Sequence, residues 1–224
     1  ITKSINVVTV KTLTDISPQV GYDYLENFGF TTLDQKDIVQ SLALGGITNG
    51  VTNLELTAAY ATIADGGTYT RPRFYTRILD HDGNVLLDNT AETHTVLKET
   101  TAWLLTDAMK DVVSVGTGGR AAFDGMAIAG KTGTTTKNRD ALFAGFTPYY
   151  TCVVWCGYDD NSPQNKSGQT NTPKLLWRNV MERIHENLEY KDFTQPDGIV
   201  TATAVSYTHP SPRDPKTSRM PSSA

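Results

Sequence analysis

The stretch GMAIAGKTGTT, residues Gly125 to Thr135, constrains the fold most, because it fits two motifs that need incompatible local structures. From Gly125, G-x-x-x-x-G-K-T is a formal match to a phosphate-binding P-loop, in which the lysine begins a helix facing the phosphates. From Lys131, K-T-G-T is typical of an edge strand that presents a lysine and two hydroxyl groups to a cleft. The flanking residues decide between the two.

The flanks disfavour the P-loop. A P-loop needs a hydrophobic strand before its first glycine, a flexible loop between its glycines and a helix after its lysine. Here turn-like AAFD precedes Gly125, apolar Met-Ala-Ile-Ala stands between the glycines, and TGTTTKNRD follows Lys131. The glycine and β-branched residues of that last segment disfavour a helix. The sequence therefore predicts a strand through Lys131 and argues against nucleotide binding.

The strand motif has a simple chemical interpretation. Lys131 supplies a positive charge, and Thr132 and Thr134 supply hydroxyl donors, a combination that holds a carboxylate. Gly133 lets another backbone approach the strand closely. Strand alternation places Lys131 and Gly133 on one face and Thr132 and Thr134 on the other, so we expect a twist or a bulge. The alternative is a strand with an exposed lysine and no ligand.

A second feature lies at the start of the chain. Ser4-Ile5-Asn6, within KSINVVTVK, is an S-x-N triplet just before an apolar helical run. A serine in this position is often only a helix cap. More than a hundred residues of largely helical pattern separate the triplet from Lys131, which makes a chance pairing of the two elements harder to defend.

The periodicity predicts helices first, then three neighbouring strands and a closing helix. Ser17-Pro18 is expected to begin a helix that ends at Gly29, and IVQSLALGG has apolar residues at helical spacing. Thr52 and Glu55 form a capping box at the start of a helix through LELTAAYATIA. Residues 98–115 again have apolar residues at helical spacing. FYTRILDHDGNVLLD predicts a β-hairpin, MAIAGKTGT, ALFAGFT and YTCVVWCGY predict strands, and Thr172 is expected to cap the last helix ahead of Pro173. Because the strand connections are too short for parallel crossovers, we expect an α+β fold with an antiparallel sheet flanked by helices.

Composition excludes several functions. The chain has 20 basic and 24 acidic residues with no basic stripe, so nucleic acid is not an expected partner. Cys152 and Cys156 lie four apart in a predicted strand, too far to bridge, and we interpret them as small buried apolar residues. We expect no metal and no cofactor. We expect His81 on a hairpin turn, His94 on a loop, His185 on the final helix and His209 in the C-terminal tail. None of these histidines is expected to be catalytic.

Together these segments resemble the transpeptidase domain of class A, bifunctional penicillin-binding proteins. The supporting text includes KSINVVTVK, VGTGGRAAF, AGKTGTT and RDALFAGFTPYYTCVVWCGYDDN. The resemblance implies a serine transpeptidase/β-lactamase-like fold. It also implies D,D-transpeptidation: a serine of an S-x-x-K motif attacks a D-alanine carbonyl of a peptidoglycan stem peptide, and the acyl group passes to an amine. The expected partners are stem peptides and β-lactam antibiotics.

Roles for individual residues follow only from this resemblance. Ser4 and Lys131 would be catalytic: Ser4 would belong to the proton-relay network around the nucleophile, and Lys131 would tune that network electrostatically and also bind the terminal carboxylate. Asn6 would bind the stem-peptide amide. Thr132, Gly133 and Thr134 would bind substrate, the two threonines through its terminal carboxylate, and the backbone N–H of Thr134 would belong to an oxyanion hole. Asp140 is expected to fix the strand entry.

The resemblance also sets expectations about the limits of the chain. No serine is followed three residues later by lysine, so we expect a fragment that lacks the nucleophile helix and the N-terminal strands and is inactive alone. We expect the transpeptidase domain to cover residues 1–195 and a disordered tail to cover 196–224. From about Val205 the tail resembles a translated sequencing adapter. The parent protein would be membrane-anchored and act at the extracytoplasmic face of the bacterial cell membrane.

Two other functions remain open at this point. A β-lactamase-like hydrolase or a β-lactam sensor would share K-T-G, and rapid turnover of the acyl-enzyme would distinguish the hydrolase. A non-catalytic peptidoglycan-binding module would keep the cleft without the chemistry, and a sequence lacking S-x-x-K upstream of Ser4 would favour it.

Overall fold

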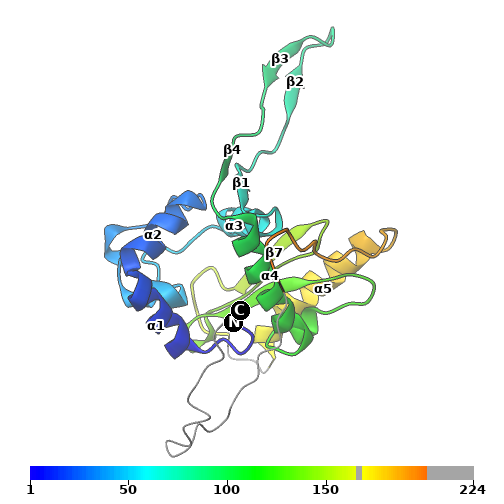
Figure 1. Ribbon diagram of the computed structural model, residues 1–224. Helices are drawn as coiled ribbons and strands as arrows, with labels where there is room; N and C mark the ends of the chain where they lie inside the picture. The colour runs from blue at the N-terminus through cyan, green and yellow to red at the C-terminus, as the bar shows by residue number, and fades with distance from the viewer. Residues whose placement is uncertain (165–167, 201–224) are drawn as a thin grey trace, which may run out of the picture.

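A computed structural model describes residues 1–164 and 168–200 (Figure 1). The α-helices are α1 (Asn6–Ile16), α2 (Pro18–Asn27), α3 (Asn53–Ala64), α4 (Glu99–Ser114) and α5 (Thr172–His185). The strands are β1 (Thr68–Thr70), β2 (Arg77–Leu79), β3 (Val85–Asp88), β4 (Thr93–Thr95), β5 (Ala129–Thr134), β6 (Asp140–Phe146) and β7 (Thr151–Gly157). Short 3-10 helices lie at Gln35–Asp37, Gln40–Leu44, Gly119–Ala121, Thr136–Asn138 and Gln169–Asn171. The predicted α+β class is confirmed.

The central sheet has the order β5-β6-β7 and is antiparallel throughout, as the short connections predict. The β5–β6 register runs without interruption from Ala129 opposite Phe146 to Thr134 opposite Ala141. The β5–β6 register contains no bulge, so of the two features expected, a twist or a bulge, the bulge is absent. Among the described strands, β5 has a neighbour on one side only, which leaves its other edge open along the K-T-G-T segment.

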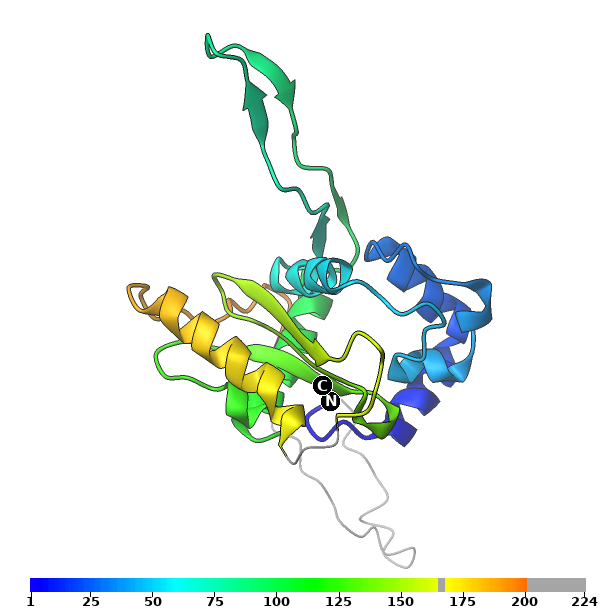
Figure 2. The same cartoon turned by 180° about the vertical axis from the view of Figure 1, so that it is seen from behind.

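Helices cover both faces of this sheet. On one face, Phe143 packs edge-on against Trp177 of α5, with ring centroids 5.1 Å apart. On the other face, Ala129 and Phe146 form a buried cluster with Met109 of α4, and side chains of α3 pack against it. Figure 2 shows α5 crossing the sheet on the side away from α4. The large buried aromatic side chains therefore hold β5 in a three-layer body.

A helical lobe precedes this body. It comprises α1, α2 and the 3-10 turns up to Leu44, and it has a small core of its own built on Leu13, Tyr22 and Leu42. Ser17 begins α2 as predicted, since its side chain accepts a hydrogen bond from the backbone N–H of Val20.

Several predicted details of the helices and strands can be compared with the structure. The capping box of Thr52 and Glu55 is confirmed at the start of α3. Thr172 is not a cap: it is already helical, and the preceding Asn171 makes no side-chain capping bond. His94 lies in β4 and not in a loop.

The cysteines also differ from the expectation. Cys152 and Cys156 are free thiols on β7, as their spacing predicts, but they are half-buried and not fully buried. The reason is their place on the outer strand of the sheet, where α5 covers only part of the surface.

A long arm projects from the body between β1 and β4 (Figure 1). Its outer part is the predicted hairpin, with Ile78 opposite Leu87. Its base is a β1–β4 pair, Thr68 opposite Thr95, that the sequence analysis missed. At the C-terminal end, Gln195 Nε2 closes a turn on the carbonyl of Ile199 at 2.9 Å. His209 and the expected tail beyond residue 200 lie outside the described residues.

Candidate functional site

Lys131 and Ser4 meet at the open edge of β5. Lys131 Nζ donates a hydrogen bond to Ser4 Oγ at 2.9 Å, joining residues 127 positions apart. The same ammonium donates to the backbone carbonyl of Thr132 at 3.0 Å. A lysine ammonium has three N–H donors, so one remains for a ligand.

The charge of Lys131 is not neutralised by a neighbouring carboxylate. None of the ion pairs formed within residues 1–164 and 168–200 includes this lysine. Its side chain is half-buried, and burial lowers the pKa of Lys131 below its usual value of 10.5. A partly desolvated, unpaired cation at an open strand edge favours an anionic ligand.

Strand β5 places the other predicted residues next to Lys131. Thr132 is half-buried, and its Oγ1 lies 2.8 Å from Oγ1 of Thr117. Thr134, at the end of the strand, is exposed. The Lys131 side chain bonds Ser4 beside this strand although β5 carries no bulge.

Gly133 has space around it. A Cβ at this position would meet only the Leu142 side chain, at an ordinary contact distance of 3.6 Å. At Gly130, in the same strand, a Cβ would lie 2.8 Å from the carbonyl oxygen of Ala144. Packing within the protein therefore requires glycine at position 130 but not at position 133. The glycine at 133 is better explained by the open side of the strand, where it leaves room for a ligand.

Asn6 and Ser4 come from the other side of the site. Asn6 is the first residue of α1 and is exposed. Ser4 lies two residues before the first residue of this helix and has a left-handed conformation, with φ of 53°. Its side chain makes no capping bond to α1, since Ile5 is the residue at the cap position. The interpretation of Ser4 as a simple helix cap is therefore wrong.

Asp140 lies at the entry to β6, away from the Ser4–Lys131 contact. Its carboxylate accepts hydrogen bonds from Thr135 Oγ1 at 2.8 Å and from Trp155 Nε1 at 2.9 Å. These bonds close the turn between β5 and β6, which fits the expected role of fixing the strand.

The P-loop interpretation fails on geometry. Lys131 lies inside β5, and the next regular α-helix after it is α5, which begins at Thr172. No helix N-terminus therefore follows the lysine to receive a phosphate.

Sequence reasoning missed Thr117, although it lies in the quoted VGTGGRAAF segment. The sequence shows only a threonine between two glycines. No local pattern indicates that this threonine contacts Thr132 on β5, fifteen residues later.

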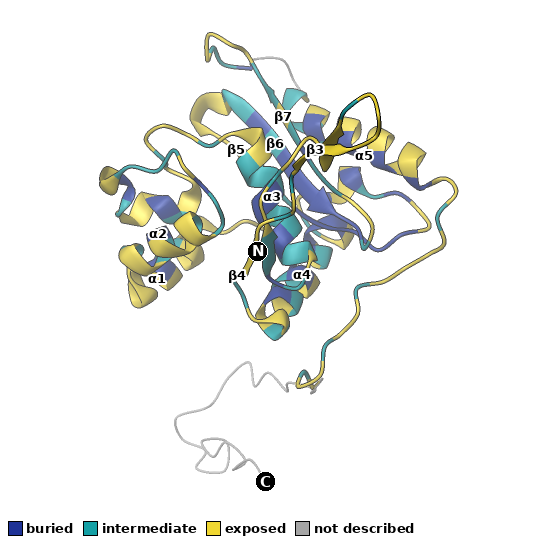
Figure 3. Ribbon diagram, turned by 90° about the horizontal axis from the view of Figure 1, so that it is seen from above, coloured by how far each residue is buried: buried dark blue, intermediate teal, exposed yellow. Residues whose placement is uncertain are grey.

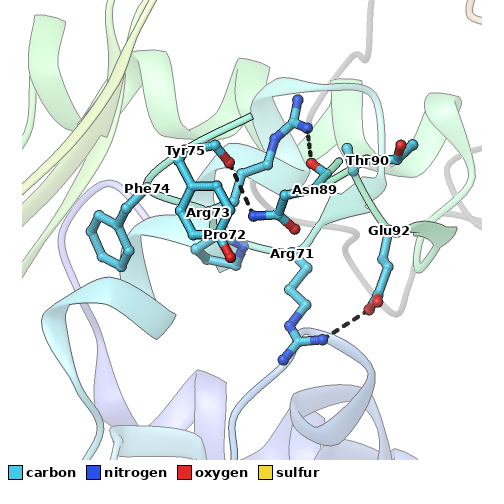
Figure 4. A pocket seen from close by; sticks show the side chains of 9 residues that line it. Arg71, Pro72, Arg73, Phe74, Tyr75, Asn89, Thr90 and Glu92 are labelled. Atoms are coloured by element: carbon cyan, nitrogen blue, oxygen red, sulfur yellow. Dashed lines mark hydrogen bonds and ion pairs between the residues drawn. The ribbon is translucent and has the colours of Figure 1, made fainter. Parts of the chain in front are cut away.

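Two hollows on the described surface lie away from these residues. One, of about 290 Å³, lies in the arm between its β1–β4 base and its outer hairpin, and it is lined by Arg71, Arg73 and Phe74 among others (Figure 4). The other, of about 580 Å³, lies between the ends of α3 and α4 and the segment around Phe193. The candidate site lies at the open edge of β5.

Within residues 1–164 and 168–200, no three His, Cys, Asp or Glu side chains gather as a metal site requires. No helix in the same ranges combines the length and the apolar character needed to span a bilayer.

Comparison with known proteins agrees with this geometry. Residues 1–182 match the family described as "Penicillin binding protein transpeptidase domain". Penicillin-binding protein 1A of Clostridium botulinum is 38% identical over 203 residues, covering 89% of this chain and 24% of that protein. Penicillin-binding protein 1F of Bacillus subtilis is 36% identical over 207 residues, covering 89% of this chain and 28% of that protein. The chain thus spans about a quarter of the length of these relatives.

Solved structures share the fold. Penicillin-binding protein 1A of Haemophilus influenzae aligns with a TM-score of 0.78 at 22% identity, covering 88% of this chain and 35% of that one. PonA1 of Mycobacterium tuberculosis, in complex with penicillin V, aligns with a TM-score of 0.64 at 25% identity, covering 74% of this chain and 47% of that one. The chain belongs to the penicillin-binding protein transpeptidase domain family.

Proposed function

We propose that this chain carries the Ser-x-Asn and Lys-Thr-Gly side of a serine D,D-transpeptidase site that takes peptidoglycan stem peptides. The observation that carries the proposal is the hydrogen bond from Lys131 Nζ to Ser4 Oγ, because it joins the two sequence elements at an open strand edge. Membership of the transpeptidase domain family supports the same conclusion.

The carboxylate end of the peptide would bind along β5. The unpaired charge of Lys131 and the hydroxyls of Thr132 and Thr134 suit a terminal carboxylate, since charge-assisted hydrogen bonds are the stronger ones. Gly133 leaves room for the peptide backbone to lie beside the strand. The backbone N–H of Thr134 would be one donor of the oxyanion hole.

The reacting end would lie towards Ser4 and Asn6. Ser4 Oγ accepts a hydrogen bond from Lys131, so its own proton is free to be passed to or from a neighbouring group. A lysine whose pKa is lowered by burial suits such a relay, because its proton is less tightly held. Asn6 would bind an amide of the stem peptide with its exposed side chain.

The chemistry would be acyl transfer in two steps through a serine ester. A serine oxygen attacks the penultimate D-alanine carbonyl and terminal D-alanine leaves with a proton; an amine of a second strand then displaces the serine. No serine of this chain has lysine three residues later. We therefore expect the 224-residue chain to form no covalent adduct with a labelled penicillin, and a stable adduct would contradict this.

β-Lactams and the cellular setting complete the proposal. PonA1, which shares the fold, has been solved in complex with penicillin V. We expect β-lactams to be recognised through the same carboxylate contacts. The whole protein would be membrane-anchored and act at the extracytoplasmic face, where peptidoglycan lies.

The test measures ligand binding without needing the nucleophile. The chain, labelled with ¹⁵N, is titrated with an N-acylated D-Ala-D-Ala peptide while amide NMR shifts are followed. We expect shifts in β5, and Lys131→Ala should weaken binding by roughly tenfold or more, because a hydrogen bond to a charged group contributes about 1.5–3 kcal/mol.

Lys3→Ala is the matched control. It removes one positive charge beside Ser4 but leaves the Lys131–Ser4 hydrogen bond in place. If both variants bind the peptide as the parent chain does, or if no shifts appear in β5, the proposed function is wrong.

A further inference from the structure

Thr117 lies where three distant segments meet beside the candidate site. Its hydroxyl Oγ1 is 2.8 Å from Oγ1 of Thr132 on β5. Its backbone N–H donates to the carbonyl of Thr2 at 3.4 Å, in the segment that leads to Ser4. Its carbonyl accepts from Lys174 Nζ, on α5, at 3.5 Å. Thr117 is therefore connected to both sides of the site.

The backbone on each side of Thr117 is closely packed. A Cβ at Gly116 would lie 2.5 Å from the carbonyl oxygen of Thr2, and one at Gly118 would lie 3.0 Å from that of Val112. The N–H of Gly118 also donates to Val112 at 2.7 Å. Such a backbone holds the exposed side chain of Thr117 in one place, which is what pre-organisation of a site requires.

The contact between the two hydroxyls has a direction that matters when a ligand binds. A hydroxyl has one proton to donate and lone pairs that accept. If Thr132 donated its proton to Thr117, it would have none for a carboxylate. If Thr117 donates to Thr132, the Thr132 proton points to the ligand.

We propose that Thr117 is a positioning residue of the carboxylate subsite: its hydroxyl donates to Thr132 Oγ1 and so directs the Thr132 proton to the carboxylate of the bound peptide. This inference rests on the proposed function, because it takes Thr132 as a carboxylate ligand. It adds a residue from the loop between α4 and β5 to the site.

Two positive charges near Thr117 are consistent with an anionic ligand at Thr132. Lys174 is half-buried beside Thr117, and burial, with a smaller effect of nearby Arg120, lowers the pKa of Lys174. Neither cation takes part in an ion pair within the described part of the chain. Two unpaired positive charges on this side favour an anion at Thr132.

The experiment compares a peptide acid with its amide. The ¹⁵N-labelled 224-residue chain and its Thr117→Val variant are each titrated with N-acylated D-Ala-D-Ala as the free acid and as the C-terminal amide. Valine has the shape of threonine without its donor. We expect Thr117→Val to weaken binding of the acid about three- to tenfold, as for loss of one neutral hydrogen bond, and to leave the amide within about twofold.

Two further variants separate positioning from structure. Thr117→Ser keeps the hydroxyl and should restore the preference for the acid. Thr101→Val, at an exposed threonine of α4 with no side-chain hydrogen bond inside the described ranges, should change neither ligand. Thermal unfolding should be the same for all four chains.

The outcomes are distinct. If the unmodified chain shows no preference for the acid, the proposed function fails and this inference fails with it. If the unmodified chain prefers the acid and Thr117→Val keeps that preference, the proposed function stands and the role of Thr117 is wrong. Equal loss of acid and amide binding in Thr117→Val would show a structural role only and would also overturn the inference.

Discussion

The sheet body and the helical lobe are stabilised in different ways. The body has a core that joins α4, α5, β6 and β7, with Trp177, Phe143 and Met181 fully buried. The buried cluster of the lobe is only Leu13, Tyr22 and Leu42. Figure 3 shows the same contrast: much of the central sheet is coloured as buried, whereas α1 and α2 are coloured mostly as exposed.

The two regions are joined near the site by polar contacts. Lys131 bonds Ser4, Thr117 bonds Thr2, and Glu55 of α3 accepts from both the hydroxyl and the N–H of Thr31. The carboxylate side of the site thus stands on the rigid body, and the Ser4 side stands on the part with less core. The sheet body would therefore fix the position of an anionic ligand. Proton transfer through Ser4 would depend on how firmly the helical lobe is held against the body.

The largest expected effect is in the body. Trp177→Ala removes a fully buried side chain that packs on Phe143 and donates to the carbonyl of Cys152 at 2.9 Å. We expect the free energy of unfolding to fall by about 3–5 kcal/mol in urea titrations. Leu176→Ala, at an exposed neighbour on α5, should cost far less. Equal costs would mean that the α5–sheet core is not what stabilises the body.

A smaller and more local effect is expected in the lobe. Leu42→Ala opens a cavity in its small core and should cost about 2–3 kcal/mol. Because this core has few members, we expect amide hydrogen exchange to accelerate in residues 6–47 and to stay unchanged in β6. Acceleration in both regions would show that the lobe and the body unfold as one unit.

The smallest effect concerns the polar link at Glu55. Partial burial raises the pKa of Glu55, but hydrogen bonds from Thr31 and Thr52 outweigh it and lower this pKa from 4.5 to about 2. A carboxylate with a lowered pKa stabilises the folded state above the unfolded pKa, and this contribution is lost as the pH falls from about 4.5 to about 2.

Glu55→Gln tests this link. The unfolding free energies of the two chains should differ most above pH 5 and converge between pH 4.5 and 2. Since the Glu55 side chain is only half-buried, solvent screens its interactions and the difference will be small. A difference that stays constant with pH would exclude an ionised Glu55 as the origin of the link.

Local sequence signals predicted local structure well. Ser17-Pro18 begins α2, Thr52 and Glu55 form the capping box of α3, and the run after Gly125 becomes the edge strand with Lys131. In each case the residues that decide the structure are within a few positions of one another. The same holds for the hairpin around Asp82-Gly83.

Contacts between distant segments were not predictable in this way. The β1–β4 pair joins two three-residue strands whose partners, such as Tyr69 and His94, are separated by the whole arm. The contacts of Thr117 with Thr132 and Thr2, and of Glu55 with Thr31, depend on how finished elements pack. No periodicity or turn residue encodes them, so a single sequence shows the elements of the site but not all of its members.

The arm has a practical consequence for handling this protein. The chain leaves the body and returns to it at one place, where the N–H of Arg71 donates to the carbonyl of Glu92 at 2.9 Å. The rest of the arm extends away from the body (Figure 1), and the hydrogen-bond partners of Lys131 are Ser4 and Thr132, neither of which belongs to the arm. The arm can therefore be shortened, or carry an inserted tag or label, without disturbing the edge of β5 that we assign to the ligand.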